Sequence, residues 1–318
     1  MHRAFHALLL LILFPGTGCD CLSGLPSQID PIRRALPTGR IILYGDSRPA
    51  VTGEQYFMGR TDATQERAQI IARVASEKPD LVVHTGDLVA RGSSDDHWER
   101  WDETHKPILD AKIPFYPAIG NHEYAGDTKE ALVYFRKRFP FLGQCRWYTI
   151  KAGPLQFVLL DTNFEELKPP FVEAQDAWFL KTLESAETDP EVKALIVVSH
   201  HPPYTNSNVH GPHDETRRRF ADPAASCSKF RMYVAGHVHS YERFAIQGVP
   251  FVVTGGGGAP PTSVRTSGFR TPPAFEGPEL RPFHYLLLTT GRNGATVDCM
   301  MLQPDGSWKS GDRFELTW

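Results

Sequence analysis

The chain has 318 residues and a formal net charge of −3, from 34 Lys and Arg against 37 Asp and Glu. This near-neutral balance excludes the strongly basic class of nucleic-acid-binding proteins. A content of 41% hydrophobic and 22% charged residues excludes a collagen-like or wholly disordered chain. The length accommodates one large domain or two small ones. Thirteen histidines are the unusual part of the composition, so their positions decide what they mean.

The first 18 residues have the pattern of an export signal. Arg3 precedes an apolar run over residues 7–14, which is too short to remain as a membrane-spanning helix. Small residues then lead to Cys19, as in the lipobox of bacterial lipoproteins, where the cysteine is lipidated. Plain cleavage near Gly18 is the alternative. We therefore expect an exported protein that is periplasmic, membrane-anchored or extracellular, with membrane contact only through a lipid at Cys19.

The next segment, residues 19–38, is rich in Pro, Ser and Gly and is predicted to be a linker before a single domain at 39–318. Export would expose the cysteines to an oxidising compartment. The four cysteines that remain besides Cys19 allow three disulfide connectivities, and the sequence does not select one: Cys21, Cys145, Cys227 and Cys299.

Five short apolar runs along the chain each end in a small residue and a polar cluster. Runs of this length, rich in Val and Ile and closed by Gly or Ser, are typical of buried strands. The runs and the clusters that follow them are 40–45 before Asp46, 80–86 before Asp87, 114–120 before Asn121 and His122, 194–199 before His200, and 231–236 before His237 and His239.

Helical patterns separate these runs. The predicted helices are Asp62–Glu77, Asp96–Asp110, Lys129–Phe139 and Gln175–Glu187. Strands that alternate with helices indicate an α/β fold. In such folds ligands bind beyond the carboxyl ends of the strands, so we expect all five polar clusters to meet at one rim of the sheet.

The rest of the chain has a different pattern. Strands without intervening helices are predicted at 146–150, 155–161, 251–254, 284–290, 295–303 and 313–317. The first two form a hairpin, and Pro304-Asp305-Gly306 is a turn before the last strand. The stretch 259–282 contains six prolines and is predicted to be an irregular exposed loop.

The histidines concentrate at the polar clusters. Seven of the thirteen lie in or beside them: His122, His200, His201, His210, His213, His237 and His239. Imidazole is the commonest metal ligand, and imidazole and carboxylate ligands without cysteine suit Mn, Fe, Zn or Co. On an extended strand His237 and His239 would face the same way, whereas on a tight loop they would reach two different ions.

Five motifs carry a resemblance to a known family. GDSR (45–48), GDLV (86–89), GNHE (120–123), VVSHHPP (197–203) and GHVH (236–239) resemble, in order and spacing, the signature of calcineurin-like metallophosphoesterases. GHVHSYER (236–243) and the stretch 200–213 are closest to purple acid phosphatases and their bacterial relatives. The resemblance implies an α/β fold: a layered β-sandwich flanked by helices in four α/β/β/α layers.

The resemblance also implies a metal site that holds one or two divalent or trivalent transition ions, Mn, Fe or Zn. Asp87 would bridge both ions. Asn121, His200 and His237 would hold the second ion, and Asp46 and His239 the first. The implied activity is a metal-dependent hydrolysis of mono- or diesters in a small phosphorylated substrate, by attack of a metal-activated hydroxide.

The sequence departs from the family at the first ion. Members complete that site with a histidine two residues after the first aspartate or a tyrosine three residues after the bridging one, and this chain has Arg48 and Ala90 there. A guanidinium only donates, so it cannot be a ligand. Arg48 either contacts the substrate phosphate, which makes it a candidate catalytic residue, or pairs with a nearby carboxylate.

Two histidines are candidates for proton transfer. His122 resembles the catalytic histidine of the family, which stabilises or protonates the leaving group. His210 resembles a substrate-contacting histidine of the plant enzymes and is a second candidate acid. His201 is interpreted as structural rather than as a ligand, because adjacent side chains on an extended segment diverge.

Other features have simpler interpretations. His84 is predicted to be a core histidine with satisfied nitrogens, Arg217–Arg219 a solvated helix face, and Gly255–Gly258 a close-packed turn near the site. Two alternatives to an enzyme stay open. One is a phosphate- or nucleotide-binding protein whose incomplete first site gives little turnover. The other is a structural surface lipoprotein that holds no metal.

Overall fold

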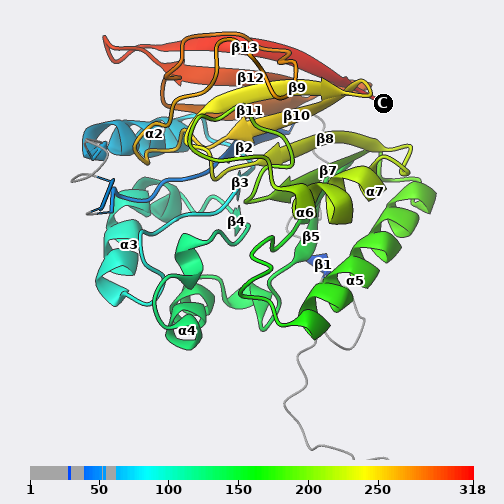
Figure 1. Ribbon diagram of the computed structural model, residues 1–318, viewed down its shortest axis with the longest axis horizontal. Coiled ribbons are helices and arrows are strands. Elements are labelled where there is room, and N and C mark those ends of the chain that lie inside the picture. The colour runs from blue at the N-terminus through cyan, green and yellow to red at the C-terminus, as the bar shows by residue number, and fades with distance from the viewer. Residues whose placement is uncertain (1–27, 30–38, 52, 55–61) are drawn as a thin grey trace, which may run out of the picture.

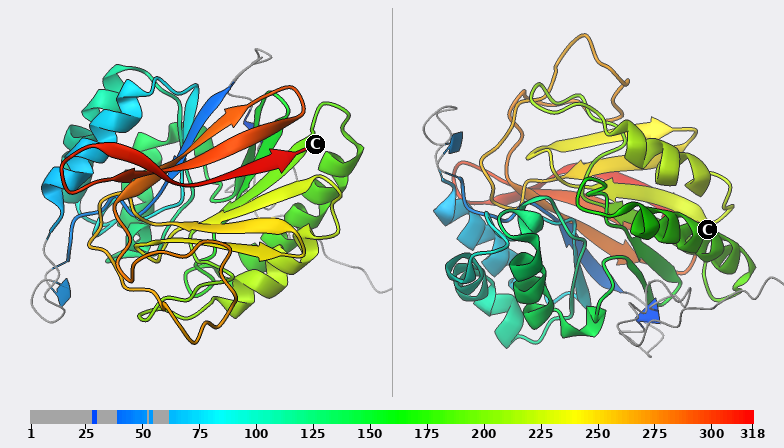
Figure 2. Two further views of the ribbon diagram at one scale, coloured as in Figure 1. Left: turned by 90° about the horizontal axis from the view of Figure 1, so that it is seen from above. Right: turned by 60° about the horizontal axis from the view of Figure 1, so that its bottom comes forward.

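The computed structural model describes residues 28–29, 39–51, 53–54 and 62–318. The predicted signal segment 1–18, Cys19, Cys21 and nearly all of the predicted linker lie outside these described residues. Two mixed β-sheets pack face to face, and helices cover their outer faces (Figures 1 and 2). The expected layered β-sandwich flanked by helices is therefore confirmed.

The first sheet has six strands in the order β13-β12-β11-β2-β3-β4. Its three motif strands, β2, β3 and β4, are parallel, and its C-terminal strands β11, β12 and β13 are antiparallel. The strand bounds are β2 Arg40–Tyr44, β3 Leu81–His84, β4 Phe115–Pro117, β11 His284–Thr290, β12 Gly294–Leu302 and β13 Trp308–Thr317.

The second sheet has seven strands in the order β1-β5-β6-β7-β8-β10-β9. The predicted hairpin β5–β6 is antiparallel, whereas β6, β7 and β8 run parallel. The bounds are β1 Gln28–Ile29, β5 Tyr148–Ala152, β6 Leu155–Leu159, β7 Ala194–Ser199, β8 Phe230–Ala235, β9 Tyr241–Ile246 and β10 Val249–Thr254.

All four predicted helices form, with ends displaced by up to six residues. They are α2 Thr64–Ser76, α3 Asp95–Asp110, α4 Thr128–Arg138 and α5 Pro169–Thr188. The described residues also form short helical turns: η2 His122–Tyr124, η3 Pro140–Leu142, α6 Asp214–Thr216, η4 Arg217–Ala221 and α7 Asp222–Ala224. Among the described residues no helix is both long and apolar enough to cross a bilayer.

Strand β7 shows how the layers are built. Ala194, Ile196 and Val198 belong to the core between the sheets, whereas Leu195 and Val197 belong to the core beneath α5. Successive side chains of a strand point to opposite faces, so a strand buried on both faces is apolar throughout. The continuous apolar runs of the sequence therefore correspond to strands inside a four-layer structure.

One expectation about the rim needs correction. The five motif strands do not share a sheet, since β2, β3 and β4 belong to one sheet and β7 and β8 to the other. The clusters still meet, because the sheets pack with these strand ends at a common edge. A direct contact shows this: the backbone N–H of His237, after β8, donates to the carboxylate of Asp46, after β2, at 3.0 Å.

Several smaller expectations are confirmed and several short elements were missed. The nitrogens of buried His84 lie 3.1 Å from both Ser47 Oγ and the Gly86 amide, so this histidine is satisfied. Arg217–Arg219 lies in a helical turn, where Arg219 pairs with Asp176 and Glu215. Strand β9, the helical turns η2 and η3 and those at 214–224 were not predicted, nor was the two-residue strand β1 within the predicted linker.

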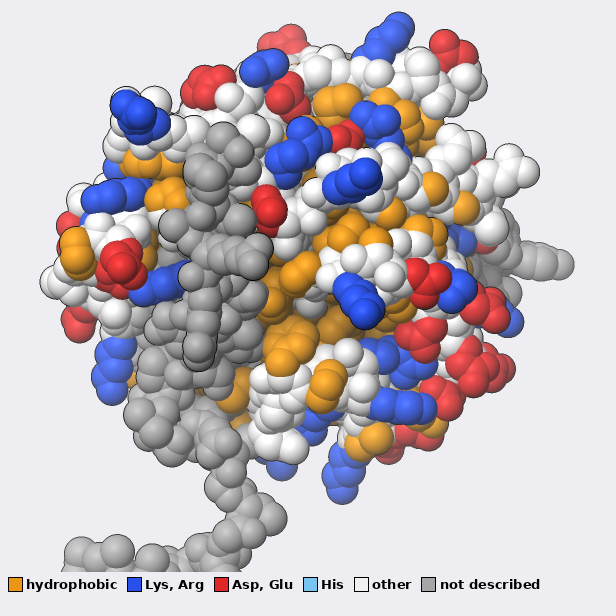
Figure 3. Space-filling model, turned by 180° about the vertical axis from the view of Figure 1, so that it is seen from behind, with side chains coloured by type: hydrophobic (Ala, Val, Ile, Leu, Met, Phe, Trp, Pro, Cys, Tyr) orange, Lys and Arg blue, Asp and Glu red, His pale blue; other side chains and the backbone are white. Residues whose placement is uncertain are grey.

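The surface carries mixed charges, and the described cysteines differ in their bonding. On the face opposite to the view of Figure 1, hydrophobic side chains gather near the centre among basic and acidic ones (Figure 3). The interspersed signs agree with the near-neutral composition. Cys145 is disulfide-bonded, whereas Cys227 and Cys299 are free thiols.

His105 predicts a pH dependence of stability. Its ring stacks on Trp101, its Nδ1–H donates to the Trp101 carbonyl at 3.1 Å, and burial lowers its pKa to about 3. An unfolded histidine has a pKa of about 6.5, so below that pH the unfolded state takes up the proton first and stability falls toward pH 3. Between pH 7.5 and 5 this effect should lower the unfolding free energy of the wild type by about 2 kcal/mol. His105→Gln should not show this part of the decrease.

Urea denaturation at the two pH values measures this difference. Lys106→Gln, at an exposed position of the same helix, should keep the wild-type dependence. Equal pH dependences for His105→Gln and the wild type would contradict the assignment.

Candidate metal centre and active site

The six predicted ligands converge at the common edge of the two sheets. Five follow strand ends directly or by a short turn, and His239 lies two residues beyond His237. Three of them adopt the left-handed backbone conformation that non-glycine residues rarely take: Asp46 at φ 58°, Asp87 at φ 59° and His237 at φ 68°. Such strained positions cluster at functional sites because the surrounding structure determines them. Here the left-handed turn places a ligand side chain directly past the end of a strand.

Two glycines permit the close approach of these turns. A Cβ on Gly120 would lie 2.3 Å from Oδ1 of Asp87, and one on Gly255 would lie 2.8 Å from Oδ2 of Asp46. Any side chain at either position would therefore displace a candidate ligand. The Gly255 contact confirms that the glycine run 255–258 is a close-packed turn at the site, as predicted.

His200, Asn121 and Asp87 form the core of the cluster of ligand atoms that was predicted for the second ion. His200 is fully buried, and its Nδ1–H donates to the Thr85 carbonyl at 2.9 Å, so the lone pair of a neutral ring is on Nε2. This Nε2 lies 3.0 Å from Oδ1 of Asn121 and 3.3 Å from Oδ1 of Asp87. Burial lowers the pKa of His200, which favours the neutral ring.

His237 completes this cluster. Its Nδ1 lies 3.2 Å from Oδ1 of Asn121 and 3.3 Å from Nε2 of His200. In the His237 tautomer that carries its hydrogen on Nε2, acceptor atoms from four side chains face one another with fewer hydrogens than lone pairs. A cation between them converts this repulsion into attraction, and imidazole, carboxylate and amide donors suit Mn, Fe or Zn. The residues present therefore fit a transition-metal ion.

The cluster that was predicted for the first ion lies beside this one. Asp46, Asp87 and His239 place ligand atoms within 4.8 Å of one another, and all three residues are buried. The Nδ1–H of His239 donates to the Pro260 carbonyl at 2.7 Å, so its Nε2 faces Asp46 at 3.6 Å. His237 and His239 therefore serve different clusters, which agrees with the tight-loop alternative rather than with an extended strand.

The two buried carboxylates have unlike proton affinities. Burial and the neighbouring charge of Asp87 raise the pKa of Asp46 well above its usual value. Burial acts to raise the pKa of Asp87 as well, but His200, His122 and Arg48 together hold it below its usual range. Asp87 is thus the carboxylate that is kept ionised between the clusters.

Arg48 is paired with a carboxylate, which was one of the two alternatives predicted for it. Its terminal nitrogens both donate to Glu54 at 2.8 Å, and its Nε lies 3.5 Å from Oδ2 of Asp87. Burial acts to raise the pKa of Glu54, but its bonds to Arg48 lower the value to about 2. Contact of Arg48 with a substrate stays a prediction. Glu54 was not identified from the sequence, because no motif links it to the cluster.

His122 and His210 both lie at the edge of the clusters. His122 donates its Nδ1–H to the Ala90 carbonyl at 2.8 Å, and its Nε2 lies 3.8 Å from Oδ2 of Asp87. The ring centre of His210 is 4.4 Å from that of His237. The acid roles of these two histidines remain proposals.

His201 lies nearer to the ligands than the sequence suggested. Its Nδ1 is 2.9 Å from the Thr162 hydroxyl, which agrees with a structural role. It nevertheless presents a ligand atom within 4.8 Å of those of His200 and His237. A role as an additional ligand is therefore geometrically available to it.

Glu123 is a functional residue that sequence reasoning missed. Its buried carboxylate accepts from the backbone N–H groups of four residues at 2.7–3.3 Å: Asp87, Leu88, Val89 and Gly120. Burial and the charge of Asp87 raise its pKa to about 8. It fastens the turn that carries Asp87 to the turn that carries Asn121. Its place in the GNHE motif was the available signal.

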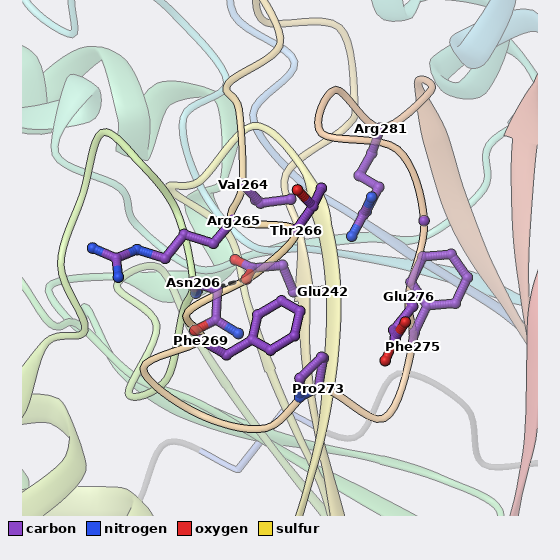
Figure 4. Close-up of a pocket in the computed structure, with 11 residues that line it drawn as sticks. Asn206, Glu242, Val264, Arg265, Thr266, Phe269, Pro273, Phe275, Glu276 and Arg281 are labelled. Atoms are coloured by element: carbon purple, nitrogen blue, oxygen red, sulfur yellow. Dashed lines mark hydrogen bonds between the residues drawn. The ribbon is translucent and has the colours of Figure 1, made fainter.

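The proline-rich stretch 259–282 extends the site on one side. It is irregular, as predicted, and its Pro260 carbonyl orients His239. Beneath it lies a cavity of about 40 Å³ in which Arg281 stacks on Phe275 (Figure 4). Buried Glu242 lies on its wall and accepts from the Asn206 amide at 2.7 Å. None of the six predicted ligands lines this cavity.

Comparison with known proteins agrees with this geometry. The family model described as Calcineurin-like phosphoesterase matches residues 40–241, which is more than half of the chain. Purple acid phosphatase 1 of Ipomoea batatas is 30% identical over 184 residues, covering 53% of this chain and 37% of the relative. A probable glycerophosphodiester phosphodiesterase of Arcobacter nitrofigilis is 28% identical over 169 residues, covering 51% and 57%.

A solved structure shares the fold. A purple acid phosphatase from yellow lupin seeds superposes with a TM-score of 0.67 at 18% identity, covering 91% of this chain and 55% of that one. In each of these comparisons the matched region spans less than two thirds of the relative's own length.

Glu123 gives a prediction for stability. Glu123→Ala leaves four buried N–H groups without their carboxylate, and each costs about 1–3 kcal/mol when it is left unsatisfied. We expect a loss of at least about 3 kcal/mol in unfolding free energy, measured by denaturant titration. Glu130→Ala, at an exposed position of α4, should change stability by less than about 0.5 kcal/mol. A near-wild-type stability for Glu123→Ala would show that the carboxylate does not fasten the two turns.

Proposed function

This chain belongs to the calcineurin-like phosphoesterase family, and we propose that it is an exported, metal-dependent phosphoesterase acting on mono- or diesters of small phosphorylated compounds. The observation that carries the proposal is the close approach of Asp87, Asn121 and His237 to Nε2 of buried His200, at distances of 3.0–3.3 Å. The names of the phosphatase and phosphodiesterase relatives support the reaction class.

The bound metal would be Mn, Fe or Zn. Such an ion activates a water molecule as a nucleophile and neutralises charge on the phosphoryl oxygens. The chain's own contribution is to fix the ligand atoms before the ion arrives. Thr85 sets the tautomer of His200 and Pro260 that of His239, because each backbone carbonyl accepts the Nδ1–H.

His122 is the proposed acid for the leaving group. Because its Nδ1–H is held by the Ala90 carbonyl, Nε2 is the nitrogen left to exchange a proton with a substrate. That nitrogen lies 3.8 Å from Oδ2 of the Asp87 carboxylate. His210, beside His237, is the second proposed acid, and Arg48 the proposed source of fixed positive charge near the phosphoryl group.

A second candidate function is a phosphate- or nucleotide-binding protein with little turnover. The observation that favours it is Arg48, which cannot act as a ligand for an ion beside Asp46 and His239. Export, with or without a lipid at Cys19, is part of the main proposal and depends on residues 1–19, which lie outside the described ones. A structural lipoprotein without metal would leave the converging acceptor atoms unexplained.

The enzyme and the binding protein differ in turnover. We expect purified protein with Mn²⁺ to hydrolyse at least one member of a panel of nitrophenyl phosphate mono- and diesters. Because general-acid catalysis contributes about 10²–10⁴-fold, His122→Ala should lower kcat by a factor in this range for a substrate with a poor leaving group. Hydrolysis no faster than in the absence of protein, across the whole panel, would favour the binding protein.

The converging acceptors give a sharper prediction. Asp87→Asn and His237→Ala each remove a ligand atom from the more complete cluster, so both should lower kcat/KM by more than about 100-fold and reduce bound metal. Elemental analysis and steady-state kinetics measure the two effects. Asp305→Asn, in the exposed turn before β13, is the matched control and should behave like the wild type. Full activity of both ligand variants would place the catalytic site elsewhere.

A further inference from the structure

We infer that this chain binds a single divalent metal ion, and that the guanidinium of Arg48 stands where a second ion would otherwise be held. The inference deepens the proposed function, since it concerns the composition of the same site. It rests on the unequal surroundings of the two clusters of ligand atoms.

Arg48 is built into the cluster from both its backbone and its side chain. Its backbone N–H donates to the Asp87 carbonyl at 3.1 Å, which holds the residue beside the proposed bridging ligand. Its side chain is buried, and its Nε lies 3.5 Å from Oδ2 of Asp87. Among the described residues this Nε–H has no hydrogen-bond partner. The Nε edge of the cation, without a hydrogen bond among the described residues, therefore faces the carboxylate that a second ion would need.

Glu54 prevents the guanidinium from turning away. Its two carboxylate oxygens accept from the two terminal nitrogens of Arg48, and one of them also accepts from the Val51 amide at 3.0 Å. A bidentate pair of this kind fixes the plane of the guanidinium. Arg48 is thus clamped on its outer side, with its Nε edge directed inward.

Ligand supply differs between the two clusters as well. Nε2 of His200 lies 3.0–3.3 Å from atoms of Asp87, Asn121 and His237, so these four side chains offer four ligand atoms to one ion. The other cluster consists of Asp46, Asp87 and His239, and both oxygens of Asp46 also accept from the His237 N–H at 3.0–3.1 Å. Asp46 therefore already positions the backbone of another ligand.

The charge of Arg48 adds to this shortage. A guanidinium remains protonated at every accessible pH, so it offers no lone pair and repels a cation placed beside it. The burial of Arg48 strengthens the repulsion, since water screens it less. One ion and one fixed cation are the combination that the described residues support.

Metal counting tests the inference. We expect the wild type to bind one Mn²⁺ per chain in calorimetric titration and in elemental analysis after desalting. In the double variant Arg48→His/Glu54→Gln the new imidazole supplies a ligand and no unpaired carboxylate stays buried, so the count should rise to two. Spin coupling between neighbouring Mn²⁺ ions should then appear in the electron paramagnetic resonance spectrum.

The matched control is Arg138→His/Asp102→Asn. It alters a partly buried bidentate Arg–Asp pair between α4 and α3, and should leave the count at one. Two ions in the wild type would overturn the inference. An unchanged count in a folded Arg48→His/Glu54→Gln variant would show that Arg48 does not exclude the second ion.

A second pair of variants decides the matter if that double variant does not fold. His239→Ala should keep one ion, whereas His237→Ala should lose it. Loss of the ion in both would contradict the inference. The metal count is independent of turnover, so a protein with one ion and no hydrolysis would refute only the proposed activity, and a hydrolase with two ions would refute only the present inference.

Discussion

The site depends on one contact between the two sheets. The backbone N–H of His237 donates to the carboxylate of Asp46 at 3.0–3.1 Å, which joins the end of β8 in one sheet to the end of β2 in the other. Both residues are in the left-handed backbone conformation, which costs on the order of 1–3 kcal/mol each and persists only where packing determines it. The four-layer core supplies that packing, so the stability of the sandwich maintains the geometry of the ligands.

The sequence predicted the elements of the fold better than their partners. Runs such as Ala194–Ser199 are apolar on both faces, and this made them recognisable as buried strands. The same uniformity hides which sheet a strand joins, because no alternation marks a solvent face. Strand β9 was missed because it carries Glu242 and Arg243, whose charges are satisfied by Asn206 and by Asp312. Those partners lie 36 and 69 residues away, beyond the reach of any local pattern.

The site shows the same division. All six candidate ligands follow predicted strand ends or their turns. The direction of those strands could be read from the sequence, and this made the meeting of the six side chains predictable. Glu123 and Glu54 matter here through contacts that the folded structure creates, with four backbone amides for Glu123 and the Arg48 guanidinium for Glu54. Acidic residues are common, so neither stood out by composition. The sequence predicted which side chains would come together, and the structure was needed to find what holds those residues in place.

The position of Arg48 changes how the chemistry must be shared. A second divalent ion would bring two positive charges to the phosphoryl group and could shift them with the reacting oxygens. A guanidinium brings one, and Glu54 draws part of its field outward through two 2.8 Å hydrogen bonds. Less positive charge is then available to neutralise the negative charge that develops on the leaving oxygen. Proton transfer to that oxygen therefore becomes more important. His122, with Nε2 directed toward Asp87, and His210, against His237, are the side chains in place for it. The proposed single-ion centre therefore requires a larger contribution to catalysis from the two proposed acids, His122 and His210.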